Sequence, residues 1–169
     1  MIKRSHIGVC AAALLLVAGC ASFDGHGLVE KGASAADVEA LMGSPAARVA
    51  KADGGSVLYY PRLPIGRSSY AVTLGPDAKV SGVEQLLTME SISRLKPGEM
   101  STRDVRELIG PTIPSLVSRL SRQQRDVWEY PWMNFSERRI LAVQFSDDGV
   151  LREVINLSDD YYRSPGGLR

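Results

Sequence analysis

The chain has 169 residues, of which 20 are basic and 19 acidic, so its formal net charge is +1. This balance gives no bulk attraction to nucleic acid, and no nucleic-acid partner is expected. The length suits one domain or two small ones. The chain has only two histidines and two cysteines, the side chains on which tight zinc sites and Ser/His or Cys/His catalysis depend.

The N-terminus has the pattern of a bacterial lipoprotein signal. Lys3 and Arg4 precede an apolar run over residues 7–17, which is shorter than the ~20 residues of a membrane-spanning helix. The run closes on Val17-Ala18-Gly19-Cys20, the pattern at which lipoprotein precursors are acylated on cysteine and cleaved just before it. We therefore predict lipidation of Cys20; a plain secretory signal with a chance cysteine is the alternative.

Cleavage divides the N-terminal region into a signal peptide, residues 1–19, and a lipidated tether, residues 20–27. Ala21 follows the cysteine, whereas Asp there is the usual inner-membrane retention cue of proteobacterial lipoproteins. The predicted location is thus the periplasmic face of the outer membrane, with the acylated Cys20 held by outer-membrane lipid.

Processing also removes or modifies the cysteines and one of the two histidines, side chains on which many catalytic sites depend. Cys10 leaves with the signal and Cys20 becomes a thioether, so no free thiol remains, and His26 in the tether is the last histidine. Nucleophilic triads and tight zinc or copper sites need these side chains. We predict no catalytic residue, no metal site and no cofactor, and hence a protein that is not an enzyme.

The remaining chain repeats itself. The segment Ser34 to Gly43 resembles Ser101 to Gly110, and Ser, Asp, Val, Leu and Gly recur at the same places. Later segments match in the same order, with gaps only at loops: Val57 to Pro61 with Val127 to Pro131, and Tyr70 to Leu74 with Leu141 to Phe145. Two tandem units therefore explain the pattern better than coincidence.

Each unit begins with a short helix. Ser34 and Ser101 are N-cap residues with an aspartate three positions later, and Gly43 and Gly110 follow the apolar stripe where a helix ends. Three segments per unit then have strand patterns: 57–60, 70–74 and 80–86, and 127–130, 140–145 and 150–157. The predicted fold class is α+β, with two tandem units of a helix and a three-stranded antiparallel meander, and the helices packed on one face of the sheets.

An extra helix is predicted in the second unit, and a tail follows that unit. Residues 113–125 have Leu116, Val117 and Leu120 at helical spacing, which predicts a short extra helix. The predicted boundaries are 28–92 for the first unit, 93–157 for the second, and 158–169 for a flexible tail without periodicity.

The segment from Leu95 to Pro111 resembles the BamE/SmpA family of small outer-membrane lipoproteins. The shared pattern is a Val-x-x-Leu-hydrophobic-Gly helix followed by Pro, then a Trp-x-Tyr strand, here Trp128-Glu129-Tyr130, and a hairpin. The first unit keeps the helix pattern but has Leu58-Tyr59-Tyr60 in place of Trp-x-Tyr. The resemblance implies an outer-membrane lipoprotein that supports β-barrel assembly or envelope integrity, with the barrel-assembly machinery as the implied protein partner.

Two tandem units depart from the single unit of the assembly factor in that family. Tandem units of this shape also resemble the β-lactamase-inhibitor-protein fold, which is a protein-binding scaffold. An inhibitor-like or binding module that captures a periplasmic enzyme or ligand is therefore the alternative function.

Three features could carry binding. Trp128, Tyr130 and Trp132 alternate and share one strand face, which favours core packing; alternatively Trp132 and Phe135, beyond Pro131, are exposed anchors for a partner, with Tyr130 beside them. The edge strands could accept a strand from a partner. The third feature is a group of arginines that form a solvated face or contact lipid headgroups or an acidic partner: Arg119, Arg122, Arg125, Arg138 and Arg139.

Overall fold

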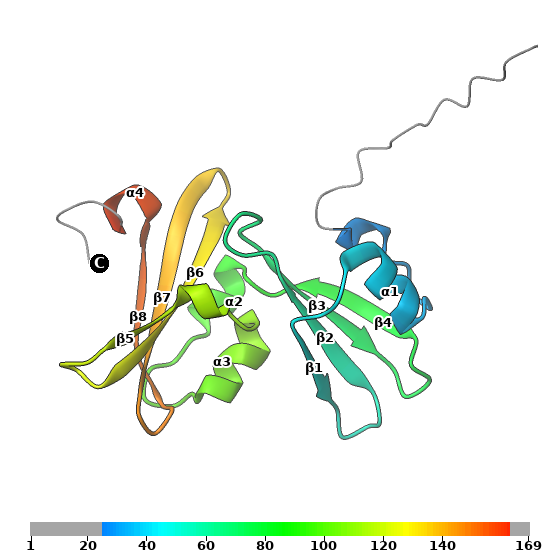
Figure 1. Ribbon diagram of the computed structural model, residues 1–169, viewed down its shortest axis with the longest axis horizontal. Helices are drawn as coiled ribbons and strands as arrows, with labels where there is room; N and C mark the ends of the chain where they lie inside the picture. The colour runs from blue at the N-terminus through cyan, green and yellow to red at the C-terminus, as the bar shows by residue number, and fades with distance from the viewer. Residues whose placement is uncertain (1–24, 163–169) are drawn as a thin grey trace, which may run out of the picture.

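The computed structural model describes residues 25–162, so the predicted signal peptide, Cys20 and the last seven residues lie outside the described residues. The described chain is α+β and contains two four-stranded antiparallel sheets, ordered β1-β2-β3-β4 and β5-β6-β7-β8 (Figure 1). None of its helices is long and apolar enough to cross a membrane.

The first half of the chain forms one helix and one sheet. Its elements are η1 (His26–Leu28), α1 (Ala35–Met42), β1 (Ala47–Ala50), β2 (Ser56–Pro61), β3 (Ser69–Leu74) and β4 (Val80–Gln85). Val38 and Met42 project from one side of α1 into a buried cluster with Leu58 of β2 and Val72 of β3. The helix is therefore held by apolar burial against the sheet, since eight residues are too few for a stable isolated helix.

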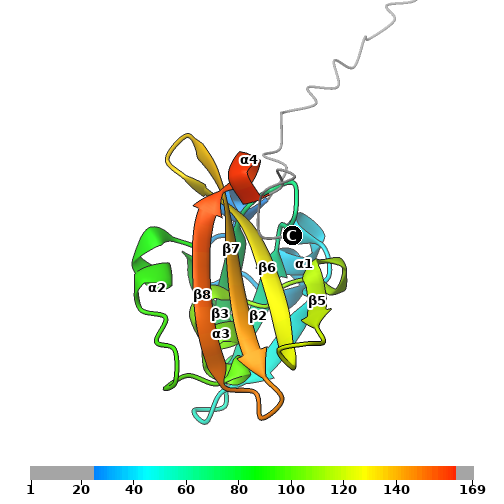
Figure 2. The same ribbon diagram turned by 90° about the vertical axis from the view of Figure 1, so that its left-hand side faces the viewer.

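The second half repeats this order and adds a short helix at each end. Its elements are α2 (Met89–Ser93), α3 (Thr102–Ile109), η2 (Pro114–Leu116), β5 (Val117–Leu120), β6 (Arg125–Asn134), β7 (Glu137–Ser146), β8 (Leu151–Ser158) and α4 (Asp159–Tyr162). Val105 and Ile109 of α3 share a buried cluster with Tyr130 and Trp132 of β6. Figure 2 shows the four strands of this sheet face on.

Local details of the two halves coincide. Ser34 and Ser101 each form a complete capping box with the aspartate three residues later. An isolated bridge joins each N-cap to the turn before the last strand, and a bulge follows Thr73 in one sheet and Gln144 in the other. Matching register irregularities at matching positions are what the sequence repeat predicts.

The helix α3 lies between the two sheets (Figure 1). One side packs on the second sheet through Val105 and Ile109, and its C-terminal end touches the first: a Cβ at Gly110 would lie 2.2 Å from the Ser69 hydroxyl oxygen. The pKa of the Tyr59 hydroxyl on β2 is raised by burial and then by the negative charge of Glu107. The layers therefore run α1, first sheet, α3 with α2, second sheet.

The connection between the halves supports this contact. Leu86 packs with Tyr59 and Ala71 on the first sheet, whereas the next residue, Leu87, belongs to the core cluster of the second half. Neighbouring side chains of one extended segment point to opposite sides, so this segment contacts both cores.

Each meander has four strands, not the predicted three. The fourth strand in each half is short, β1 with four residues and β5 with four, and each lies at an edge of its sheet. The predicted extra helix over 113–125 is wrong as well: only the 3-10 turn η2 forms there, and a β5–β6 hairpin follows. Val117 and Leu120 are 43% and 37% exposed, so a helix here would have had no core in which to bury its apolar stripe.

The two predicted flexible ends are partly ordered. Residues 25–27 were expected within the tether, but Gly25 packs against the Leu41 carbonyl and His26 stacks on Tyr70 at 4.0 Å between ring centroids. At the other end, Ser158 closes β8 and Asp159 begins α4 with only 5% of its surface exposed. Contacts with the folded body order both segments.

Gly110→Ala should destabilise the protein more than Gly43→Ala. Both glycines have a φ near +80° and a ψ near 180°, a region that only glycine adopts readily, so each substitution should cost about 1–3 kcal/mol. Only Gly110 faces the other sheet, whereas nothing lies within 4 Å of the Cβ site at Gly43. Urea unfolding of both variants measures the difference, and equal losses would contradict the packing of α3 on the first sheet.

Acid should weaken the capping boxes. Hydrogen bonds from the Ser34 side chain and backbone lower the pKa of Asp37, and those from the Ser101 backbone and side chain lower the pKa of Asp104. A carboxyl whose pKa is lowered by folding stabilises the fold above its unfolded pKa of about 4, and this contribution is lost as the pH falls through the folded value.

An Asp37→Asn, Asp104→Asn double variant should therefore lose stability less steeply than the parent as the pH falls below about 4. Urea midpoints across this acid range measure the slope. Asp160→Asn, at an exposed position in α4, is the control and should retain the parental slope; an unchanged slope in the double variant would contradict the proposed role of the caps.

Candidate functional site

The predicted aromatic anchors separate into core and surface residues. Tyr130 and Trp132 are 0% and 1% exposed and belong to the core cluster beneath α3, so the favoured interpretation of core packing holds for both, and the alternative of Trp132 as an exposed anchor is wrong. Pro131 does not end β6, because β5 pairs with β6 only as far as Trp128, and β6 continues beside β7. Phe135, in contrast, is 96% exposed at the tip of the β6–β7 hairpin.

The first three predicted arginines lie on a hairpin instead of a helix. Arg119 on β5 forms ion pairs with Asp126 and Asp147 at 3.0 and 2.6 Å. Arg122 lies in the exposed β5–β6 turn, and Arg125 at the start of β6 pairs with a β8 carboxylate at 2.9 Å. These pairs are surface pairs and contribute little to stability individually.

The other two arginines lie near the β6–β7 tip. Arg139 donates from Nε to the Asn156 side-chain oxygen at 3.0 Å, which also accepts from the Trp132 indole at 3.2 Å. Arg138 is more open, with 68% of its side chain exposed and its Nε 3.8 Å from Asp159. Arg139 therefore has a structural role, whereas Arg138 reaches solvent.

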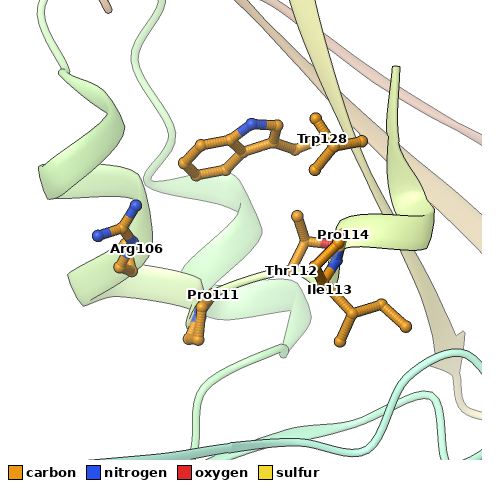
Figure 3. Close-up of a pocket in the computed structure, with 7 residues that line it drawn as sticks. Arg106, Pro111, Thr112, Ile113, Pro114 and Trp128 are labelled. Carbon is orange, nitrogen blue, oxygen red and sulfur yellow. The ribbon is translucent and has the colours of Figure 1, made fainter. Parts of the chain in front are cut away.

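A pocket of about 460 Å³ lies where α3, η2, β5 and β6 meet. Figure 3 shows Trp128 across from the chain that runs from Pro111 to Pro114, with Arg106 at one side. The Arg106 guanidinium carbon lies 5.7 Å from the Trp128 ring centroid, within range of a cation–π contact. Val117 at the start of β5 completes the lining.

Hydrogen bonds fix the walls of this pocket. The Thr112 hydroxyl donates to the Glu129 carbonyl at 2.8 Å, and the buried Tyr130 hydroxyl donates to the Gly110 carbonyl at 3.1 Å. Burial raises the pKa of the Tyr130 hydroxyl, which therefore stays protonated and remains a donor. Trp128 is backed by Phe145, with ring centroids 4.7 Å apart. A pocket with preset aromatic and proline walls and one cation suits an apolar side chain with a nearby carboxylate from another molecule.

The pocket adjoins an open sheet edge. The strand β5 is the edge of its sheet, and all four of its residues are exposed. An extended segment could hydrogen-bond to this edge while placing one side chain in the pocket. The residues that shape the pocket differ in the first half, where buried Leu58 occupies the position of Trp128 and Glu39 that of Arg106.

The described residues contain no group of three or more side chains that could hold a metal ion. His26, the one histidine between residues 25 and 162, is stacked on Tyr70 far along the chain from the pocket. The Asp147-Asp148-Gly149 run forms the turn between β7 and β8, where Asp148 accepts a hydrogen bond from Ser146.

Comparison with known proteins identifies the second half. Residues 84–154 match the family described as "Outer membrane protein assembly factor BamE domain". The second unit is similar to this domain, and the matched segment is called the BamE-like domain below. The resemblance inferred from the helix and Trp-x-Tyr patterns is thereby confirmed, and the BamE-like domain includes α2, α3 and the pocket.

Two further comparisons add no functional information. No curated protein matches the chain. Among solved structures, an extracellular protein containing a SCP domain from Bacillus anthracis str. Ames is 12% identical with a TM-score of 0.31, and the alignment covers 96% of this chain and 51% of that one. The chain thus spans about half the length of that structure.

Sequence reasoning missed the pocket because its parts lie on four elements, two of which were not predicted. From the sequence, Arg106 is expected to be a solvated residue of the helix that ends at Gly110. Ile113 and Val117 fall within the extra helix predicted over residues 113–125. The available signal was the pair of prolines, Pro111 and Pro114, since two prolines so close together disfavour a helix through this segment.

Trp132→Ala should destabilise the protein by about 3–5 kcal/mol, because the indole is fully buried and its removal leaves a cavity and breaks the hydrogen bond to the Asn156 side-chain oxygen. Phe135→Ala should leave the free energy of unfolding unchanged or slightly higher, because its ring contributes no burial. Urea unfolding of the two variants tests this, and similar losses in both would contradict the assignment of Trp132 to the core.

Proposed function

We propose that this protein is a non-enzymatic lipoprotein of the outer membrane that supports β-barrel assembly or envelope integrity through protein contacts on the periplasmic face. The match of residues 84–154 to the BamE domain carries the proposal. The sequence Val17-Ala18-Gly19-Cys20-Ala21 supports the anchor and its sorting.

The pocket of the BamE-like domain and the adjoining β5 edge form the proposed partner site. Trp128 and Arg106 provide the aromatic and cationic groups that dominate interface hot spots. The exposed edge of β5 supplies unpaired backbone groups. A segment of the assembly machinery that adds a strand to β5 would hydrogen-bond to this edge and place a side chain in the pocket.

The tandem arrangement is proposed to result from duplication of one helix-and-meander unit, supported by the matching caps and bulges. Duplication favours the second candidate function, a module that binds a periplasmic enzyme or ligand. Under that alternative the protein would bind a soluble partner without any effect on barrel proteins.

Purification of the lipidated protein, tagged after Arg169, from gently solubilised outer membranes separates these functions. We expect the barrel-assembly machinery to co-purify, and gene deletion to lower mature barrel proteins and to increase sensitivity to bulky antibiotics. Val117→Asp should abolish the co-purification, because a carboxylate would enter the apolar part of the pocket at a position already 43% exposed.

Leu28→Asp is the matched control, because Leu28 is also an exposed apolar residue, at 53%, but lies on η1 in the first unit. It should leave co-purification intact. Recovery of a soluble periplasmic enzyme in place of the machinery would favour the binding-module alternative, and equal loss in both variants would reject the proposed site.

A further inference from the structure

Two apolar side chains project into solvent from one end of the molecule. Phe135 at the β6–β7 tip is 96% exposed, and Ile65 in the β2–β3 connection is 83% exposed. They are the most exposed large apolar residues among those described. Single exposed apolar residues are common, so exposure alone does not indicate a functional role for Phe135 and Ile65.

The backbone at Phe135 is unfavourable for its side chain. Register pairing continues to Asn134 and Glu137, so the turn consists of Phe135 and Ser136 alone. Phe135 has a φ of +52°, the first turn position at which hairpins prefer glycine or asparagine. A phenylalanine here lowers stability without gaining burial, which indicates a role outside folding.

The second apolar tip is fixed to the same end. Leu63 in the β2–β3 connection packs against the core cluster of the BamE-like domain. Two residues beyond Ile65, Arg67 donates to the Arg139 carbonyl at 3.3 Å and forms an ion pair with Asp159. Figure 1 shows this connection beside the β6–β7 hairpin. The contacts hold the connection that carries Ile65 against the tip half of the hairpin that carries Phe135.

The described chain begins beside α1, on the same upper side of the molecule in Figure 1 as the β6–β7 tip but over the first sheet. Gly25 is held against the Leu41 carbonyl, and His26 is stacked on Tyr70. Cys20 precedes Gly25 by five residues, which span about 18 Å when fully extended. A lipid on Cys20 would therefore keep this end of the domain close to the bilayer.

We propose that Phe135 and Ile65 insert into the interfacial layer of the membrane that holds the anchor, and so orient the domain on its surface. Apolar side chains at that depth leave water while the strands behind them remain outside. Arg138, three residues from Phe135 and 68% exposed in its side chain, is placed to meet anionic headgroups. This inference rests on the proposed lipid anchor and identifies the surface that faces the lipid.

A fluorescent label at each end of β6 tests the proposal. Phe135→Cys in the lipidated full-length protein is labelled with the environment-sensitive dye NBD and reconstituted on vesicles of phosphatidylethanolamine and phosphatidylglycerol. Gln124→Cys is the matched control, because Gln124 is also exposed in a hairpin turn with positive φ, +53°, but at the opposite end of β6. The acylated Cys20 does not take the label.

We expect the emission of the label at 135 to shift to shorter wavelength on vesicles and to be quenched by lipids with a shallow spin label. The label at 124 should show neither change. An Ile65→Ser substitution in the Phe135→Cys protein should reduce the blue shift, because one of the two insertion points is lost, while the urea midpoint stays at the parental value.

The remaining outcomes separate the two proposals. If the protein floats with the vesicles but the label at 135 stays in water, insertion is rejected and the anchor stands. If it does not float, the anchor is rejected, and insertion with it. A label at 135 that is shielded in native outer membranes but not in pure vesicles would show that a protein, not lipid, covers this end, and would overturn the proposal.

Discussion

The packing of α3 on two sheets at once determines how the halves of this molecule fit together. One side of the helix fills the core of the BamE-like domain, and its last turn meets the first sheet at Gly110, where a side chain would collide with Ser69. Without this contact, the two halves would be connected mainly by the 86–95 segment and the Arg67 loop. The glycine that ends the helix therefore also sets the distance between the sheets.

The features that the sequence predicts well are those that depend on residues close together in the chain. Capping residues, glycine at helix ends and period-two strands depend on neighbours in the chain, and the structure has them where they are expected. The short strands β1 and β5 were missed because four residues hold too little of an alternating pattern to distinguish them from a loop or helix. Their existence depends on pairing with β2 and β6, which is not a local property.

The candidate site was harder to predict than the fold. Trp132 is buried because β6 continues past Pro131 with β7 as its single neighbour. Pro131 has no backbone N–H to donate, and its position faces the side where β5 has already ended. The exposure of Phe135 could be predicted from the polar residues around it, Asn134, Ser136 and Glu137, which indicate a turn. The pocket could not be predicted, because it depends on how α3 packs relative to β5. No pattern within either segment indicates that packing.

Two hairpin residues illustrate how the chain compensates for strain. Arg67 and Phe135 both have a positive φ of about 50° without being glycine. Arg67 gains from its position, since it forms a largely buried ion pair with Asp159 and a hydrogen bond to the Arg139 carbonyl. Phe135 is 96% exposed, so burial within the chain does not offset its strain. The proposed insertion of the phenyl ring into an apolar layer would supply a compensating interaction from outside the chain.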